Sequence, residues 1–465
     1  MSEGSVAGLC RLTIRAPDKV LDLAVPSDIP VADLLPVIVG YAGDDLDERG
    51  AEHGGWILQR VGEDPLDGES TAEGLQLRDG ETLLLRLRTE ALPPVRYDNL
   101  VDAVSTTIRD LPFAWTPAVS RWTLRIMATF ALLSCLAVLA LTGDPSSRIT
   151  LSLGAGLIVL AGAGAASRVL DDHPGGVLLG LLSAGFLSLS GVLLIGDPLA
   201  TPRSHRLAGA ELLAGSMAGA VGAVLGLVVV TVFAVVFAAL AVVFSASALG
   251  GVLMLVLDAP FCDAAAGVAA LVVIFGAFVP MMSFSLAGLR LPPLPTNAEQ
   301  LQEGIEPHSS EDIAARARTT DHWMSGLYFA VGVVCCACLM GMARHADTPQ
   351  MVTSGLLVSL LALHSRSMGT AWHRIALGVP AVLGVPLLVL EVADGHGPSG
   401  HLAAAAMLLL FAVLLAVISW TVPGRRLLPY WGRAGDLLQS ATAIALLPAV
   451  LWALGLYQDL RAISG

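Results

Sequence analysis

The densest group of potential metal or redox ligands in the sequence is Cys335-Cys336-Ala337-Cys338. Zinc sites need convergent Cys and His side chains at a spacing that a loop can close, whereas this group lies inside a long apolar run. The pattern is typical of cysteines that pack as small apolar side chains. The six cysteines of the chain show no disulfide framework either. The sequence therefore predicts no metal ion and no cofactor.

No other pattern of residues indicates catalysis. Lys19 is the only lysine, and the loop Gly-x-x-x-x-Gly-Lys-Ser/Thr that cradles nucleotide phosphates does not precede it. The ten histidines include no His-Glu-x-x-His motif. We therefore expect a protein that is not an enzyme, so that any ATPase working with it is a separate chain.

The composition divides the chain into an acidic head and an apolar body. Of the 465 residues, 55% are hydrophobic and 14% are charged, against about 45–50% and about 25% in soluble domains. The first 120 residues hold 21 acidic and 10 basic side chains, whereas the other 345 hold 18 and 16. This balance excludes a water-soluble enzyme, and the acidic excess argues against nucleic-acid binding.

The head, residues 1–90, has the element order of a β-grasp, ubiquitin-like α+β domain. Apolar side chains alternate in two strands on either side of a turn at Lys19, and further strands are expected at 56–61 and 81–88. Between them we expect a helix capped by Ser27 or Asp28. A small sheet with one helix favours docking of a partner as its function, the alternative being a folded cap without a dedicated partner.

Residues 91–121 are interpreted as a linker that carries a short amphipathic helix. Val101, Val104 and Ile108 would share one face of this helix.

The body, residues 122–460, is predicted to be an α-helical polytopic membrane domain. Apolar runs of about 20 residues, the length that crosses a bilayer, recur eleven times. The split between the fourth and fifth spans is expected at glycines near Gly222 and Gly226. The eleven spans are placed at 122–142, 150–167, 176–196, 207–225, 228–250, 264–285, 323–342, 350–367, 375–393, 401–421 and 437–457.

Arginine counts predict the orientation of these spans. With the head in the cytosol, the inner flanks hold twelve arginines and the outer flanks five, as the positive-inside rule requires. An odd number of spans then places the N-terminus in the cytosol and the C-terminus outside.

One long loop, residues 286–322, is predicted on the cytosolic side between the sixth and seventh spans. It contains the stiff stretch LPPLP, in which proline fixes the backbone. Arg290, Pro293 and Pro295 are candidate residues for docking a partner there.

A helix is expected to begin late in this loop. Ser309 and Asp312 resemble a capping box. Either a solvated charged face or a partner contact fits the charged residues that follow, which are Arg316, Arg318 and Asp321.

The predicted membrane interior holds almost no ionisable side chain. No span carries a central Asp, Glu, Lys or Arg, although transporters place coupling residues near the midplane. Glu211 lies one turn inside the outer end of the fourth span, from where we expect it to reach water. The alternative to a scaffold is a secondary transporter of a small solute or lipid with a cytosolic regulatory domain, for which Glu211 is the candidate coupling residue.

Small residues favour close helix packing in the fourth span. Glycines at a spacing of four let helix backbones approach one another. Contacts within the chain are favoured over contacts with another subunit. The glycines concerned are Gly215, Gly219, Gly222 and Gly226.

Three stretches are similar to the EccD family. They are VPSDIPVADLLPVIV in the head helix, LPPLPTNAEQL after the sixth span and ARARTTDHWMSGL at the entry to the seventh. None is a catalytic signature, but with the head, linker, eleven spans and single long inner loop they make the whole chain resemble EccD. This family supplies membrane components of the ESX, or type VII, protein secretion systems of actinobacteria.

The resemblance implies a function and a set of partners. The protein would be a non-enzymatic structural subunit in the bacterial inner (cell) membrane, present as a homodimer whose helix bundles enclose a lipid-filled vestibule. Its head would dock the motor, an EccC-like ATPase of the FtsK/SpoIIIE type, with EccB and EccE as membrane neighbours. No nucleic acid is expected among the partners.

Overall fold

The structure, a computed structural model, falls into two compact units, Met1–Pro117 and Ala118–Gly465. The second unit starts within the first membrane helix, whose first residue, Pro117, lies five residues before the start of the predicted span. Proline is favoured at this position because the first helical residue needs no N–H donor. The structure describes residues 8–17, 19–43, 46, 49–50, 54–90, 101, 104, 108, 115–141, 143–197, 204–289, 309–343, 347–394, 397–421 and 429–457.

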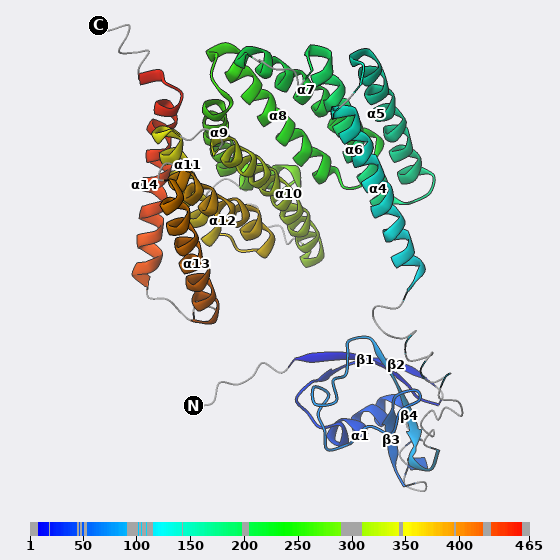
Figure 1. Ribbon diagram of the computed structural model, residues 1–465. Helices are drawn as coiled ribbons and strands as arrows, with labels where there is room; N and C mark the ends of the chain where they lie inside the picture. The colour runs from blue at the N-terminus through cyan, green and yellow to red at the C-terminus, as the bar shows by residue number, and fades with distance from the viewer. Residues whose placement is uncertain are drawn as a thin grey trace, which may run out of the picture. The chain divides into compact units, whose positions relative to one another are not determined.

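The head is a four-stranded mixed sheet with one helix packed on it (Figure 1). Its strand order is β2-β1-β4-β3, in which β1 pairs antiparallel with β2 and parallel with β4. The helix α1 covers the face on which the apolar side chains of all four strands gather. The predicted β-grasp fold is therefore confirmed. The bounds are β1 Leu9–Arg15, β2 Val20–Pro26, α1 Val31–Ala42, β3 Trp56–Gln59, β4 Glu81–Leu87 and a 3₁₀ turn, η1, Arg88–Glu90.

The predicted cap of α1 is wrong. The helix begins after Pro30 with no side-chain cap, because Ser27 instead extends the β1–β2 hairpin through a bond from its N–H to the Gly8 carbonyl, 2.7 Å long. The first amides of α1, those of Val31 and Ala32, donate to carbonyls of the loop that precedes β4. Long-range backbone bonds therefore satisfy the helix start.

The predicted linker helix lies mostly outside the described residues. Val101, Val104 and Ile108 are each helical and exposed. The face that they would share stays a prediction.

The body contains eleven long helices in the described part of the chain, one for each predicted span. Ten are long and apolar enough to cross a membrane, and the eleventh, α11, has 19 residues and opens with polar side chains. The bounds are α4 Pro117–Leu141, α5 Pro145–Arg168, α6 His173–Ile195, α7 His205–Val229, α8 Ala234–Leu257, α9 Phe261–Leu286, α10 Ser310–Met342, α11 Thr348–Arg366, α12 Ala371–Asp394, α13 Gly397–Thr421 and α14 Pro429–Ala453.

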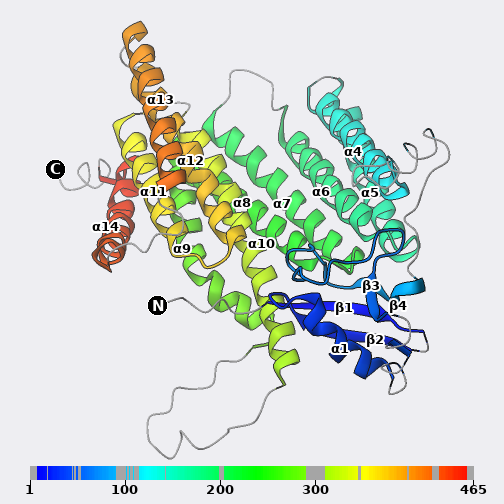
Figure 2. The same cartoon turned by 90° about the horizontal axis from the view of Figure 1, so that it is seen from below.

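Consecutive helices pack side by side in the first half of the body. Helices α5, α6, α7 and α8 follow one another as an up-and-down array in two perpendicular views (Figures 1 and 2). The break between α7 and α8 falls at 230–233, where Phe233 has φ of 63°, and not at Gly222 or Gly226 as predicted. Both glycines stay helical because their small size is used for packing against neighbours.

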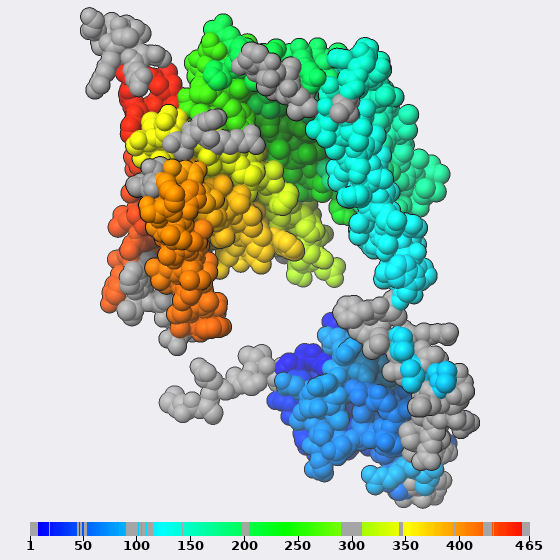
Figure 3. All heavy atoms as spheres, in the orientation of Figure 1, coloured from blue at the N-terminus to red at the C-terminus, as the bar shows by residue number. Residues whose placement is uncertain are grey.

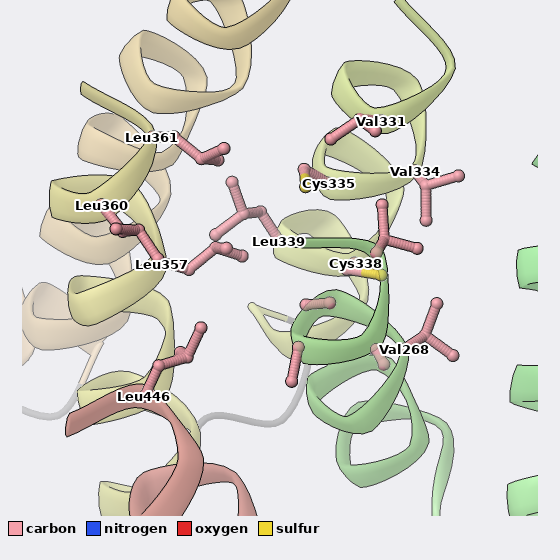
Figure 4. Packing of buried hydrophobic residues seen from close by; sticks show 14 of the residues in the cluster. Val268, Val331, Val334, Cys335, Cys338, Leu339, Leu357, Leu360, Leu361 and Leu446 are labelled. Carbon is pink, nitrogen blue, oxygen red and sulfur yellow. The ribbon is translucent and has the colours of Figure 1, made fainter. Parts of the chain in front are cut away.

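The core of the second half lies between α9, α10, α11, α12 and α14. Figure 4 shows side chains from four of these helices meeting there, among them Leu339, Leu357 and Leu446. Cys335 and Cys338 lie in the same core as free, buried cysteines, in keeping with the apolar packing expected of them.

Two helices at the edge of the body bury almost no residue completely. No residue of α4 is buried, and in α13 only Ala404 is. Both lie on the face seen in Figure 3, α4 in cyan and α13 in orange. Their apolar surfaces are therefore available to lipid or to other helices.

Candidate functional site

The ionisable side chains of the body gather at the two ends of its helices. We call the end where α4 begins proximal and the end where α4 stops distal. No described helix carries Asp, Glu, Lys or Arg in its central turns. The candidate site is therefore a set of helix ends and helix faces.

At the distal end, Arg148 joins three helices. This α5 side chain is 3% exposed, and its Nη1 lies 3.1 Å from Asp197 Oδ2 after α6. Its Nε and Nη2 donate to the carbonyls of Leu139 and Ala140 at the end of α4, each at 2.8 Å. The guanidinium group thereby satisfies carbonyls that a helix end leaves without a partner.

At the proximal end, Arg125 of α4 pairs with Asp172 at the start of α6. Nη2 and Nε of the arginine lie 2.6 and 3.2 Å from the two carboxylate oxygens, and its guanidinium group stands 4.9 Å from the ring centre of Trp122. Asp172 also caps α6 by accepting from the Gly175 amide at 3.0 Å. Arg125 is therefore held in a two-pronged ion pair.

A third arginine closes the proximal end of α7. Arg168 donates to the carbonyls of Val228 and Val229 at 2.7 and 3.0 Å. These carbonyls belong to the last turn of α7, so this side chain from α5 caps the helix at its true end.

Asp321, Ser325 and His373 meet at the proximal end of α10 and α12 in an arrangement that superficially resembles a catalytic triad. Ser325 Oγ lies 3.1 Å from His373 Nε2, and Asp321 Oδ1 lies 3.5 Å from the same nitrogen. A proton relay needs the serine and the carboxylate on different ring nitrogens. The group therefore binds α10 to α12 and does not activate the serine.

The neighbouring helices are connected by a further polar pair at this end. Gln439 of α14 bonds His364 of α11 at 3.0 Å, and Arg366 lies 2.6 Å from Asp436. These bonds join α11 to α14, as the His373 contacts join α10 to α12.

Of the predicted docking residues, three lie outside the described residues. They are Arg290, Pro293 and Pro295. Among the other three, Asp321 lies 3.5 Å from His373, and its side chain is 43% exposed.

The remaining two arginines are exposed on the first turns of α10. This helix begins as predicted, with Ser309 Oγ accepting from the Asp312 amide at 3.1 Å. Arg316 donates to the Gly288 carbonyl at 3.3 Å, and Arg318 bonds a carbonyl of its own helix. The helix continues without a break into the span.

Two of the four glycines in α7 lie against α6. A methyl group added at Gly215 would stand 2.4 Å from a methyl of Val192, and one added at Gly222 would stand 2.8 Å from Ala184 Cα. The second contact is with a backbone atom, which cannot move away by a change of rotamer as a side chain can.

The other two glycines lie against α8. A methyl group at Gly219 would stand 2.4 Å from the ring of Phe244, and one at Gly226 would stand 2.5 Å from Phe237. Along α7 the four glycines therefore contact α6 and α8 in turn. The two glycines that contact each helix are seven residues apart. All these contacts lie within the chain.

Glu211 differs from its prediction. Its side chain is 4% exposed and stands beside Gly196 at the end of α6. The side chain is therefore buried where the sequence predicted access to water.

In the head, the best-connected ion pair joins β3 to β4. Arg60 Nε lies 2.5 Å from Glu81 Oε1, and Glu81 also accepts from the Arg78 amide at 2.8 Å. Burial alone would raise the pKa of Glu81, but the hydrogen bonds from Arg60 and from the Arg78 amide outweigh it and lower that pKa. The pair is structural.

In the sequence, Arg125, Arg148, Arg168 and Arg366 are among the arginines counted near the span ends, with no indication of their partners. The partners were missed because they lie far away in the chain, 47 residues in the case of Arg125 and Asp172. One local signal was present: Asp144-Pro145 and Asp172-His-Pro are the start sequences of capped helices.

Comparison with known families decides the identity of the body. The family model described as EccD-like transmembrane domain matches residues 120–463. The chain belongs to the EccD family. A second model, described as the WXG100 protein secretion system (Wss) protein YukD, matches residues 9–85, which is the β-grasp head of this EccD chain.

Relatives match over nearly the whole chain. The Mycobacterium tuberculosis H37Rv protein "ESX-4 secretion system protein eccD4" is 26% identical, and the alignment covers 98% of each chain. "ESX-3 secretion system protein EccD3" from the same strain is 25% identical with the same coverage. The prediction of an EccD family member is confirmed.

Two solved structures share the fold. A chain in "Structure of protomer 1 of the ESX-3 core complex" superposes with a TM-score of 0.60 at 16% identity, covering 97% of this chain and 100% of that one. A chain in "MycP5-free ESX-5 inner membrane complex, State II" gives 0.57 at 17% identity, covering 89% and 99%. These likenesses extend over both units of the EccD chain.

Proposed function

We propose that this EccD protein is a structural subunit of an ESX, or type VII, secretion complex in the bacterial inner membrane. The observation that carries the proposal is that each unit matches a family model of protein secretion. The head matches the YukD model at 9–85, and the body matches the EccD-like transmembrane model at 120–463. The names of its relatives and the titles of the similar structures support the assignment to a membrane complex.

The proposed role is that of a scaffold. Polar side chains at the helix ends form ion pairs between helices, for example Arg148 with Asp197 and Arg125 with Asp172. These pairs stabilise the bundle. The exposed apolar faces of α4 and α13 would contact lipid, a second copy or the neighbouring subunits EccB and EccE. A homodimer enclosing a lipid-filled vestibule is the arrangement that we propose for these faces.

The head is proposed to dock the motor, an EccC-like ATPase of the FtsK/SpoIIIE type, from the cytosolic side. Its net charge of −10 over residues 1–90, from 18 acidic and 8 basic side chains, would steer a basic partner surface. This orientation puts the N-terminus in the cytosol and the C-terminus outside, with the proximal arginines on the cytosolic side in accordance with the positive-inside rule.

Purification in mild detergent tests the assignment. We expect the tagged full-length chain to bring down a large complex that contains an FtsK-like ATPase. Recovery of the chain alone, with secretion intact in a deletion strain, would contradict the proposal. Uptake of a solute by vesicles that contain only this protein, abolished by Glu211→Gln, would instead support a transporter.

Deleting residues 1–90 tests the role of the head separately. The shortened chain should still insert into the membrane and bind its membrane neighbours, but it should no longer retain the ATPase. Unchanged retention would reject docking through the head while leaving the scaffold role intact.

A further inference from the structure

The outer face of the head's sheet carries arginines. In β1 the side chains of Cys10, Leu12 and Ile14 lie in the core, so the alternate residues Arg11 and Arg15 point away from α1. Both are exposed. The face of the sheet that α1 leaves open is therefore basic along β1.

The same alternation adds a third arginine from β4. Leu83, Leu85 and Leu87 lie in the core, which turns Arg86 outward beside β1. The parallel register pairs Arg15 with Leu84, so Arg86 stands one strand across and two residues along, about 8 Å away between Cα atoms. We call Arg11, Arg15 and Arg86 the arginine face.

The arginine face holds more basic than acidic side chains among the described residues, although Asp79 lies at its edge and accepts from the Arg11 amide at 2.8 Å. In the part of the chain that the structure describes, these three guanidinium groups form no ion pair with a carboxylate, whereas Arg60 pairs with both Glu63 and Glu81. Asp22 on β2 shares this face and accepts from Thr13 at 2.7 Å. A positive surface thus exists on a domain of net negative charge.

A group of acidic side chains lies in α1 and in the loop that bonds its start. Asp33 is exposed on α1, and the loop that bonds the start of α1 through Gly68 and Ser70 contains Glu63, Asp64, Asp67, Glu69 and Glu73. The head therefore has a charge asymmetry across its thickness, basic on the open sheet and acidic on the helix side.

The chain leaves the head from the end of the arginine face. Strand β4 runs through Arg86 into η1, and 26 residues separate Glu90 at its end from Pro117 at the start of α4. The head is consequently joined covalently to the membrane body, which keeps it near the membrane surface. Weak attraction by three arginines is sufficient under that condition.

We propose that the arginine face rests on the anionic phospholipid headgroups of the leaflet nearest the head. Basic side chains are attracted to such a leaflet within a Debye length of its surface. Contact through the sheet would turn the acidic side, with α1, towards the cytosol. The lipid contact rests on the proposed function only because the head must lie on the cytosolic side. Such a contact would leave the acidic side of the head accessible to the motor.

Lipid-dependent quenching in nanodiscs tests this contact with the full-length chain. A fluorophore is introduced through an unnatural amino acid either at Thr82, which is exposed on the arginine face, or at Asp33 on the opposite side. Nitroxide-headgroup lipid is the quencher, in nanodiscs of phosphatidylcholine with or without phosphatidylglycerol. We expect phosphatidylglycerol to increase quenching at Thr82 but not at Asp33, and high salt to remove the difference.

A matched pair of variants identifies the arginines. Arg15→Glu should weaken the phosphatidylglycerol-dependent quenching at Thr82 about fivefold or more. Arg78→Glu changes the net charge by the same amount, but Arg78 precedes β4 and its side chain lines a hollow of about 530 Å³ with Glu63 and Glu81, so it should weaken the quenching less than Arg15→Glu.

Three outcomes would overturn the proposal. They are equal quenching at both label positions, indifference to lipid charge, and equal effects of the two variants. If lipid charge has no effect but Arg15→Glu abolishes co-purification of an acidic protein, the arginine face binds that protein instead of lipid. ATPase retention is measured on the same samples, so that failure of motor docking with intact quenching contradicts the proposed function and leaves the lipid contact standing.

Discussion

Arg148 and Asp197 form an ion pair that closes the distal end of three helices, with Nη1 and Oδ2 3.1 Å apart. The side chain of Arg148 is 3% exposed and that of Asp197 is 37% exposed. The arginine also satisfies the last carbonyls of α4 at Leu139 and Ala140. Although α4 buries no residue completely, Leu136 and Leu139 pack against α5 and α6 at that end, and Arg148 adds the polar attachment.

Replacing Arg148 by alanine should destabilise the body. The change removes the donor to the two α4 carbonyls and breaks the ion pair with Asp197, which costs about 1–3 kcal/mol, and the apparent melting temperature in detergent should fall. Arg206→Ala is the matched control, because the Arg206–Asp258 pair is 65% and 52% exposed and such pairs contribute about 0–1 kcal/mol. Equal shifts in the two variants would contradict the capping role of Arg148.

Sequence patterns predicted the elements of this protein well where the signal is local. The alternation of Cys10, Leu12 and Ile14 predicted β1, and the pairing of Ser309 with Asp312 predicted the start of α10. The cap of α1 was wrong because its first amides bond carbonyls of a loop almost 40 residues further along the chain. Hydrogen bonds to a distant backbone cannot be predicted from the residues next to the helix start.

The parts of the site that the sequence did not predict lack a local signal of this kind. Residues 207–257 contain one charged group, Glu211, so composition could not locate the break between α7 and α8, and the packing glycines were mistaken for a turn. The contact of His373 with Asp321 joins α10 to α12 over about 50 residues. The sequence could place Asp321 in the helix that enters the seventh span, but it could not predict the contact with His373 of another helix.

The glycines of α7 should differ in their tolerance of alanine. At Gly222 the added methyl group meets the Ala184 backbone at 2.8 Å, so Gly222→Ala should cost about 1–3 kcal/mol and lower the melting temperature. At Gly154 of α5 nothing lies within 4 Å, and Gly154→Ala should be neutral or stabilise by up to about 1 kcal/mol through helix propensity. A common response of both sites would mean that α6 and α7 do not pack in this way.

The contact between Asp321 and His373 should contribute to stability and not to chemistry. His373→Ala leaves a space at a site that is 3% exposed, so we expect a loss of about 1–3 kcal/mol measured by thermal unfolding in detergent. Ser325→Ala removes a hydroxyl next to the same nitrogen and should have the smaller effect. A fluorophosphonate probe that labels Ser325 in the wild type would contradict the structural role.

The pair of Arg60 and Glu81 should make the head sensitive to acid. The pKa of Glu81 is lowered in the folded head, so its stabilisation is fully present above the ordinary carboxyl value of 4.5 and is lost as the pH falls through the lower folded-state pKa. Glu81→Gln should remove about 1 kcal/mol at neutral pH and abolish this acid dependence. Hydrogen exchange of the β4 amides in the full chain, corrected for intrinsic rates, measures both effects. Glu73→Gln, at an exposed side chain, should leave the exchange unchanged, and the same response in both variants would refute the assignment.

The first turns of α10 should take part in docking the motor. Arg316 and Arg318 are exposed there, and α10 runs unbroken from this segment into the body. We expect the double charge reversal Arg316→Glu with Arg318→Glu to reduce co-purified ATPase by about tenfold through loss of electrostatic complementarity, with an unchanged melting temperature. Arg206→Glu, an exposed reversal at the distal end, is the control and should retain the ATPase. If the distal variant lost as much ATPase as the proximal one, the α10 segment would have no specific part in docking.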